Sequence, residues 1–267
     1  MKIDFSACAH FKGTNQKPLI LAEGAGLFRP TIQRIAEKSI KKDLDAIVLR
    51  SYSHPEGTDN RWKGYLEQME SYENFTKLGN GIGLYVDENR KERPLYLIHG
   101  QGLMTEKGNI QIFFTDKEIG KRGEYFKKDF DYLIERAREQ GEQVLITASR
   151  PYLWNIRDLD KIDAIEVHNG IDTKENNRKS QDLALKINKP GVIVSSSKIL
   201  YDLGSSYTNL SILPQEILNK SSIEIAKKIK NSLSKISSIG DKKEYSNISK
   251  FIQTLAILEV MVTKNKD

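Results

Sequence analysis

Short apolar runs alternate with longer amphipathic stretches along most of this chain. The alternation is clearest in the second half, where a helical stretch before Gly141 is followed by an apolar run, a loop and a second apolar run. An Asn-Gly pair, another helical stretch and a third run that follows Pro190 complete the pattern. Strands separated by helices predict parallel βαβ units with right-handed crossovers. We therefore expect an α/β domain.

The apolar runs and the helical periodicity give an outline of the expected elements. The candidate strands are Ile3–Phe5, Ala46–Leu49, Ile82–Val86, Leu95–His99, Ile110–Phe114, Val144–Thr147, Ala164–Val167 and Val192–Val194. The candidate helices are Thr31–Lys41, Arg61–Leu78, Glu124–Gln140 and Thr173–Ile187. Gly79 to Gly83 is expected to form a turn that enters a strand. After Pro214 the pattern is helical to the end, with a break near Gly240.

Composition narrows the class of protein. The chain has 267 residues, of which 38% are hydrophobic and 29% are charged, as is usual for a globular domain. No apolar run approaches the roughly 18 to 20 residues that a membrane-spanning helix requires. The single cysteine, Cys8, excludes an internal disulfide and fits a reducing compartment. We expect a cytoplasmic protein with no membrane segment.

Positive charge is concentrated near the C-terminus. The formal net charge is +6, and the stretch from Ile217 to Asp267 contains ten Lys but only five Asp or Glu. A lysine-rich helix face in contact with solvent would explain this excess. Attraction to nucleic acid or to another acidic partner would explain it as well, and the sequence leaves both open.

One segment carries a specific motif, which runs from Ser195 to Thr208 as Ser-Ser-Ser-Lys-Ile-Leu-Tyr-Asp-Leu-Gly-Ser-Ser-Tyr-Thr. It resembles, without a gap, the last motif of the polymerase and histidinol phosphatase (PHP) superfamily of metal-dependent phosphoesterases. That motif commonly reads S-D-A-H-s-x-x-d-L-G-x-a-Y-t. Ser196 stands at the position of the metal-binding Asp of the family, and Lys198 stands at that of its metal-binding His.

Other segments resemble further PHP motifs, again with the metal ligands replaced. The opening resembles D-L-H-x-H but is one residue shorter, and Ser6 and Cys8 stand at its two ligand positions. Ser51 and Tyr52 stand at the ligand positions of T-D-H, and Gly83 stands at that of G-v-E. In the segment that resembles A-H-P, Ser149 stands at the position of the His and Arg150 is an extra residue. A further segment from Ile162 to Gly170 closely resembles the family's d-a-I-E-v-y-N-g strand. We interpret that strand as architectural rather than catalytic.

The resemblance implies a fold and a place for the site. It implies an α/β protein with a PHP-type distorted TIM-like (β/α)7 barrel over residues 1–235, and a helical C-terminal extension over residues 236–267 packed on it. Active sites of such barrels lie at the C-terminal ends of the strands. We therefore expect one barrel mouth to gather Ser6, Ser51, Ser149, Ser196 and Lys198.

The replaced ligands change the expected function. The family uses divalent metals such as Zn or Mn, which are held by carboxylate, imidazole or thiolate donors. A serine hydroxyl is a poor donor, glycine has no side chain, and lysine repels a cation. We therefore predict that the chain has no metal cofactor and has lost metal-dependent hydrolysis. It would act as a binding or scaffold protein for an unknown protein or a phosphate-bearing ligand.

Three alternatives remain open at this point. A phosphoesterase, either phosphatase or nuclease, could use relocated ligands drawn from His10, His54, His99 and His168. A phosphate pocket without metal could be formed by Arg50, Arg150 and Lys198 with neighbouring serine hydroxyls. RNA binding is the third, because the protein-30 subunit of ribonuclease P resembles a metal-free PHP barrel, although this sequence agrees better with ordinary PHP motifs.

Overall fold

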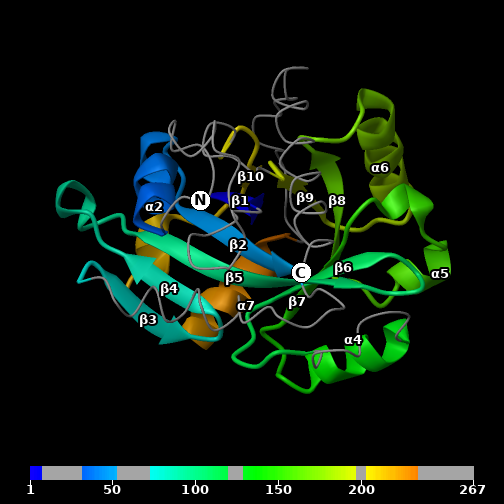
Figure 1. Cartoon of the computed structure of the whole chain (residues 1–267), viewed down its shortest axis with the longest axis horizontal. Helices are drawn as coiled ribbons and strands as arrows, with labels where there is room; N and C mark the ends of the chain where they lie inside the picture. The colour runs from blue at the N-terminus through cyan, green and yellow to red at the C-terminus, as the bar shows by residue number, and fades with distance from the viewer. Residues whose placement is uncertain (8–31, 53–72, 120–128, 197–202, 234–267) are drawn as a thin grey trace, which may run out of the picture.

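The computed structural model describes residues 1–7, 32–52, 73–119, 129–196 and 203–233, with only the backbone of residues 6, 7, 51 and 52 (Figure 1). The strands are β1 (Lys2–Ala7), β2 (Ala46–Tyr52), β3 (Phe75–Gly79), β4 (Ile82–Tyr85), β5 (Leu95–Met104), β6 (Asn109–Phe113), β7 (Leu145–Ala148), β8 (Ala164–Asn169), β9 (Gly191–Val194) and β10 (Thr208–Asn209). The α-helices are α2 (Ile32–Lys41), α4 (Phe130–Arg138), α5 (Ile156–Leu159), α6 (Lys174–Lys186) and α7 (Ser222–Leu233). Short 3-10 helices occur at η1 (Glu88–Arg90), η2 (Pro151–Leu153) and η3 (Pro214–Glu216).

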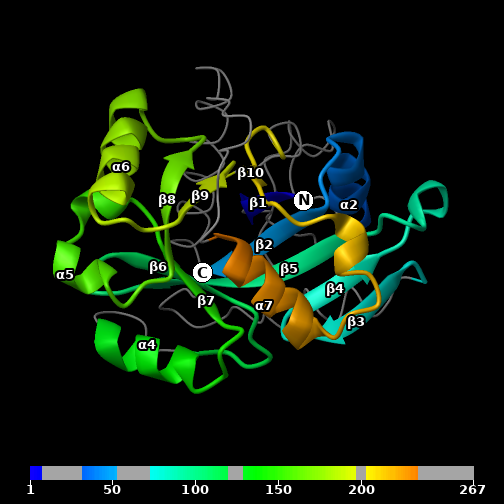
Figure 2. The ribbon, with the colours of Figure 1, turned by 180° about the vertical axis from the view of Figure 1, so that it is seen from behind.

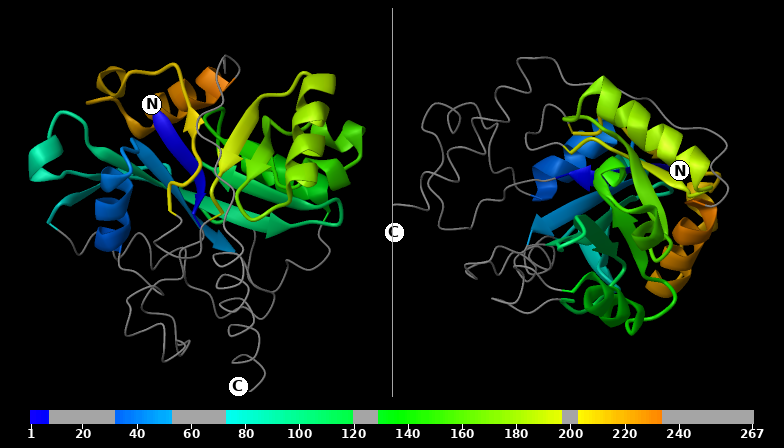
Figure 3. Two further views of the ribbon diagram at one scale, coloured as in Figure 1. Left: turned by 90° about the horizontal axis from the view of Figure 1, so that it is seen from above. Right: turned by 90° about the vertical axis from the view of Figure 1, so that its right-hand side faces the viewer.

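The described strands form one curved sheet in the order β10-β1-β2-β5-β6-β7-β8-β9. The long strand β5 is paired with β2 along one edge. Its other edge is shared by β4, which pairs with residues 95–98, and β6, which pairs with residues 100–104. The two ends of the sheet approach each other, because β9 lies against β1 and β10. The result is a nearly closed, distorted barrel, which confirms the expected fold class (Figure 3).

The predicted parallel arrangement holds from β1 through β2 to β5 and from β7 to β9. It is wrong in the middle of the sheet, and at one end β10 pairs antiparallel with β1. The pairs β1–β2, β2–β5, β7–β8 and β8–β9 are parallel, whereas β3–β4, β4–β5, β5–β6 and β6–β7 are antiparallel. The turns between β3 and β4 and between β5 and β6 are too short for the crossover that a parallel connection needs. In the first of these turns Asn80 and Gly81 both have positive φ, 50° and 67°, as hairpin turns require.

Several predicted boundaries also need correction. Residues 75–78 of the predicted helix Arg61–Leu78 are part of β3, because they pair across the hairpin with β4. The predicted helix Glu124–Gln140 corresponds to α4, which begins at Phe130 with Asp129 as its N-cap. Residues 124–128 of the prediction lie outside the described residues. Strand β5 does not end at His99 but continues through Gly100 and Gly102 to Met104. The predicted helix Thr173–Ile187 is confirmed as α6, with Thr173 as its N-cap.

Three apolar clusters organise the packing. The interior of the barrel contains Ile3, Phe5, Val48, Ile98 and Phe113 among others. A second cluster packs α4 and α6 against the outer face of β6, β7 and β8. A third packs α2 against the outer face of β2 and β5. Successive side chains of one strand therefore alternate between the interior of the barrel and its helical covering.

Helix α7 closes the N-terminal end of the barrel, and Figure 2 shows it crossing in front of the sheet. Ile225 and Ile229 of this helix belong to the interior cluster. The Lys230 ammonium donates a hydrogen bond of 2.7 Å to the carbonyl oxygen of Val144, just before β7 begins. Burial lowers the pKa of Lys230, because the charged form loses water at this position. The opposite end, where the parallel strands finish, is the mouth.

Side chains, rather than a backbone ladder, complete the barrel among the described residues. The Asp4 carboxylate of β1 accepts hydrogen bonds from the backbone N–H of Ser195 at 3.1 Å and from its hydroxyl at 2.5 Å. The Thr208 hydroxyl of β10 accepts one from the N–H of Ile193 at 2.8 Å. These bonds connect β9, and Ser195 just after it, to β1 and β10.

No described helix is long and apolar enough to cross a membrane. The C-terminal extension predicted for residues 236–267 lies outside the described residues, so the boundary after residue 235 remains a prediction.

We expect Gly100→Ala to destabilise the barrel, because the added Cβ would lie 2.7 Å from Phe113 Cε1 and 3.0 Å from Val48 Cγ1. Overpacking of a core costs about 1 to 3 kcal/mol, and chemical denaturation would measure the loss. Adding Phe113→Leu should recover part of it by providing room. If the single variant were as stable as the parent, the close packing of Phe113 on β5 would be wrong.

Candidate functional site

Strands β2, β6, β7 and β8 place polar side chains above the apolar interior, at the mouth. Arg50 follows Val48 by two residues in β2, and Thr147 follows Leu145 by two residues in β7. Gln111 lies directly opposite Thr147 in the β6–β7 ladder. Residues two apart on a strand share a face. Because Val48 and Leu145 face the interior, these three polar side chains form the next layer of the same interior toward the mouth.

Glu166 is the centre of this layer. Its carboxylate is 2% exposed and accepts a hydrogen bond of 2.7 Å from the Ser149 hydroxyl. The Gln111 amide donates to the same carboxylate oxygen and also, at 2.8 Å, to the Ser149 hydroxyl. The Asn169 amide donates to the other oxygen at 3.3 Å. The buried guanidinium of Arg50 lies 3.8 Å from Glu166 and forms an ion pair with it.

Burial raises the pKa of the Glu166 carboxyl above its ordinary value, because the ionised form loses its water. The Arg50 guanidinium and the hydrogen bonds from Ser149 and Asn169 act in the opposite direction. The net charge of the layer therefore depends on pH. When Glu166 is protonated, the positive charge of Arg50 is no longer compensated by it.

Three buried polar atoms in this region have no hydrogen-bond partner within the described part of the chain: Thr147 Oγ1, Gln111 Oε1 and Ser196 Oγ. Each of these side chains is 1% exposed. Buried polar groups without partners are costly, so most of them in native proteins are satisfied by protein, water or ligand. Each of these atoms is therefore available for a hydrogen bond that the described residues do not supply.

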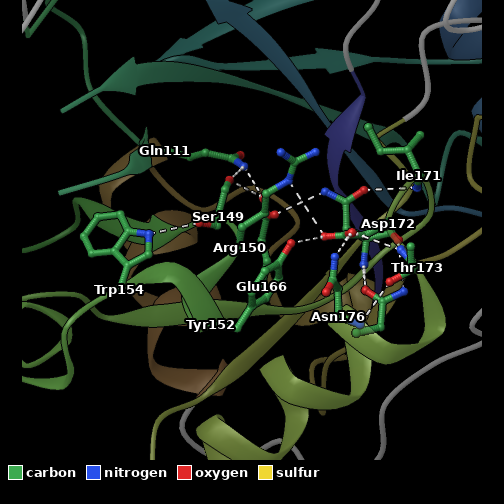
Figure 4. Close-up of polar contacts among 12 residues, drawn as sticks. Gln111, Ser149, Arg150, Tyr152, Trp154, Glu166, Ile171, Asp172, Thr173 and Asn176 are labelled. Carbon is green, nitrogen blue, oxygen red and sulfur yellow. Dashed lines mark hydrogen bonds and ion pairs between the residues drawn. The ribbon is translucent and has the colours of Figure 1, made fainter. Parts of the chain in front are cut away.

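The rim of the mouth is formed by the segments that follow β7 and β8, as Figure 4 shows. Arg150 is half exposed, and its Nε lies 3.8 Å from the Asp172 carboxylate. The Tyr152 hydroxyl donates a hydrogen bond of 2.9 Å to Asp172. Burial, followed by this hydrogen bond, raises the pKa of Tyr152 to about 12. The indole N–H of Trp154 donates to the carbonyl oxygen of Ser149 and thereby fixes the start of the rim.

Two residues at the ends of mouth strands have left-handed backbone conformations. Arg150 follows Ser149 with φ of 49°, and Ser196 follows Ser195 with the same φ of 49°. Residues with a Cβ rarely adopt this region, and such strain is often found at ligand sites. Both residues were singled out by the sequence motifs.

The positions predicted from the sequence are brought together only in part. Ser149 joins Arg50 and Glu166 in the inner layer, Ser196 follows β9, and Arg150 lies on the rim. Ser6, Ser51 and Tyr52 are described by their backbone alone, in β1 and β2. Cys8, His10, His54 and Lys198 lie outside the described residues.

Gly83 and the two described histidines occupy other places. Gly83 is opposite Leu97 in the β4–β5 ladder. Leu97 lies three residues before Gly100, the residue of β5 that pairs with Arg50. His99 is opposite Leu49, on the face of β5 that packs toward α2. Complete burial moves the pKa of His99 well below its ordinary value. His168 is opposite Ile193 in β9, and its Nε2 lies 3.4 Å from the Ser206 hydroxyl.

Three members of the candidate site were not predicted from the sequence: Gln111, Thr147 and Glu166. Glu166 was interpreted as part of an architectural strand. One signal was present, because Glu166 interrupts the apolar run Ala164–Val167 in a strand that is buried on both faces. A charged residue at such a position is rarely buried without partners. Gln111 and Thr147 give no such signal until the β6–β7 pairing is known.

The described residues do not fit a divalent metal. No three His, Cys, Asp or Glu side chains among them come together in a group that could hold one. The nearest carboxylates, Glu166 and Asp172, already receive hydrogen bonds from several neighbours. The remaining groups at the described mouth are hydroxyls, amides and guanidinium groups. They include no free imidazole or thiolate, the donors that zinc prefers, and a guanidinium repels a cation.

Comparison with known proteins supports the fold. No protein-family model matches the chain, and no curated protein matches its sequence. Among solved structures, PsfC from Pseudomonas syringae PB-5123 is similar over 98% of both chains, with a TM-score of 0.58 and 13% identity.

A second similar structure comes from Bacteroides vulgatus ATCC 8482 and is described as a two-domain protein containing a predicted PHP-like metal-dependent phosphoesterase. The similarity covers 91% of this chain and 64% of that one, with a TM-score of 0.52 and 14% identity. At these identities the similarity establishes the fold alone, which is the distorted barrel of PHP-like proteins.

Proposed function

We propose that this chain is a PHP-like barrel that binds a phosphate-bearing ligand at its mouth without a metal ion, and that it acts as a binding protein. The observation that carries the proposal is a set of three buried polar atoms without described partners. Gln111 Oε1 and Thr147 Oγ1 belong to the layer of the Arg50–Glu166 pair, and Ser196 Oγ lies just after β9. Hydroxyl groups can donate to the oxygens of a ligand, and the Gln111 oxygen can accept from one.

The charges at the mouth favour an oxyanion over a neutral or cationic ligand. Arg50 supplies a buried guanidinium in the inner layer, and Arg150 supplies a half-exposed one on the rim. A guanidinium matches the geometry of phosphate oxygens and remains charged at all ordinary pH values. Protonation of Glu166, which its raised pKa favours, would increase the positive character of the inner layer further.

The donor set supports binding without metal. Ser149 and Ser196, at the ligand positions of the resembled motifs, present hydroxyl groups in place of imidazole and carboxylate. Ser149 is already hydrogen-bonded to Glu166 and Gln111. The loss of metal-dependent hydrolysis, and the scaffold role with a protein partner, follow from the sequence motifs and remain proposals.

A metal-dependent phosphoesterase is the second candidate, favoured by the fold shared with the protein from Bacteroides vulgatus. It would need ligands from His10, His54 or Cys8, in addition to the described residues. Elemental analysis of protein purified from Zn- and Mn-supplemented medium separates the two. We expect far below one equivalent of metal; a full equivalent with turnover of a phosphomonoester or phosphodiester would favour the enzyme. A gel shift with structured RNA tests the remaining alternative, which is RNA binding.

Inorganic phosphate should bind to the protein after treatment with EDTA, as measured by isothermal titration calorimetry. Replacing Arg150 by Ala should weaken this binding about tenfold, which corresponds to about 1.4 kcal/mol, the range of a charge-assisted hydrogen bond. Arg157→Ala is the matched control, because Arg157 is an exposed arginine of α5. Equal effects of the two substitutions would mean that general charge, not the rim of the mouth, attracts phosphate.

Anion affinity should also depend on the protonation of Glu166. Sulfate is a suitable probe, since it remains a dianion between pH 8 and about 4.5, the region of ordinary carboxyl titration. At high pH the ionised Glu166 opposes the anion. As the pH falls through the raised pKa of Glu166, this charge disappears, so sulfate should bind more tightly.

The variant Glu166→Gln provides the control for this pH dependence. Its sulfate affinity should be high already at pH 8 and should change little as the pH falls. If the variant kept the pH dependence of the parent protein, a group other than Glu166 would control the charge of the mouth. Circular dichroism would confirm that the variant is folded.

A further inference from the structure

Asp4 is a fully buried carboxylate on the first strand. Its neighbours Ile3 and Phe5 face the interior of the barrel. Asp4 is 0% exposed, and the Ser195 N–H and hydroxyl donate to its Oδ1 and Oδ2 respectively. Oδ2 also accepts a hydrogen bond of 3.1 Å from the N–H of Gly204. One carboxylate therefore fixes two residues that are nine positions apart in the sequence.

These two residues flank the segment that begins with Ser196. Ser196 has φ of 49°, a conformation that is unfavourable for a residue with a Cβ and that persists only when its surroundings hold it. Ser195, the residue before it, is held by Asp4 through both its backbone and its side chain. The Ser196 hydroxyl is thereby kept buried at the mouth, where it has no partner among the described residues.

We propose that Asp4 is a positioning residue for the ligand site: it holds Ser195 and Gly204 so that the Ser196 hydroxyl points to bound phosphate. This inference rests on the proposed function. Asp4 does not touch the ligand itself, because it lies on the face of β1 opposite to Ile3 and Phe5. Its effect passes through the backbone at Ser195.

The variant Asp4→Asn tests the proposal. Asparagine retains one oxygen acceptor for the Ser195 N–H, but its NH₂ group replaces the oxygen that accepts from Gly204 N–H. Two donors would then face each other, which leaves the Gly204 N–H without its acceptor. We expect inorganic phosphate to bind about tenfold more weakly in calorimetry. Hydrogen exchange of the Ser195 and Gly204 amides should become faster.

Two further variants distinguish positioning from a general loss of stability. Asp45 is also a buried carboxylate, but it lies at the start of β2, where it accepts hydrogen bonds from the Lys2 N–H at 2.7 Å and from Arg93 at 2.5 Å. Asp45→Asn should lower the melting temperature while leaving phosphate affinity within twofold. Ser195→Ala removes the hydroxyl hydrogen bond to Asp4 while keeping the backbone N–H that Asp4 accepts from, and it should weaken phosphate binding about threefold. It also provides the test if Asp4→Asn does not fold.

The outcomes separate the two proposals. Weaker phosphate binding in Asp4→Asn and Ser195→Ala, with normal binding in Asp45→Asn, would support positioning. Unchanged binding in the Asp4 and Ser195 variants, or a loss in all three that follows the melting temperature, would overturn it. If the parent protein bound no phosphate, the proposed function would fall. Amide exchange at Ser195 in the Asp4→Asn variant would then decide whether Asp4 holds Ser195 in place. Exchange at the same rate as in the parent protein would refute that role.

Discussion

The barrel depends on how β9 is joined to β1. Among the described residues no backbone ladder connects β9 to β1. Instead, the buried Asp4 carboxylate of β1 accepts two hydrogen bonds from Ser195, just after β9, and one from the N–H of Gly204. Charge-assisted hydrogen bonds of this kind are stronger than neutral ones. A carboxylate buried without such donors would be costly, so folding of β1 and correct placement of Ser195 depend on each other. The same hydrogen bonds of Asp4 therefore both close the barrel and set the geometry of its mouth.

The mouth contains a second buried carboxylate with a different character. Glu166 interacts with Arg50, Ser149, Gln111 and Asn169, yet burial still raises its pKa. A buried ion pair contributes little net stability, because the loss of water offsets the attraction between the charges. Under the proposed function the pair has a further role, because protonation of Glu166 increases the positive charge that an anion at the mouth would meet.

Features that depend on neighbouring residues in the sequence were predicted better than features that depend on residues far apart in it. Helix α6 and strands β7 to β9 were predicted well, because their periodicity and caps are local signals. The antiparallel middle was not, because the alternation of apolar and helical stretches does not show which strands are joined by short hairpin turns. The continuation of β5 past His99 was missed as well, because its glycines resemble a strand end unless Phe113 packs over Gly100. At the candidate site, Ser149 and Ser196 were singled out from motifs. Gln111 and Thr147 could not be, because only the pairing of β6 with β7 brings them to the mouth.

The central claim is that the mouth binds an oxyanion through protein groups alone. The most direct measurement is a crystal structure of EDTA-treated protein soaked with tungstate, a phosphate analogue whose anomalous signal locates it without ambiguity. We expect one tungstate at the mouth, within hydrogen-bonding distance of Ser196 and an arginine, Arg50 or Arg150, and no metal ion beside it. A mouth without tungstate at saturating concentration, or tungstate bound only through a metal ion, would contradict it.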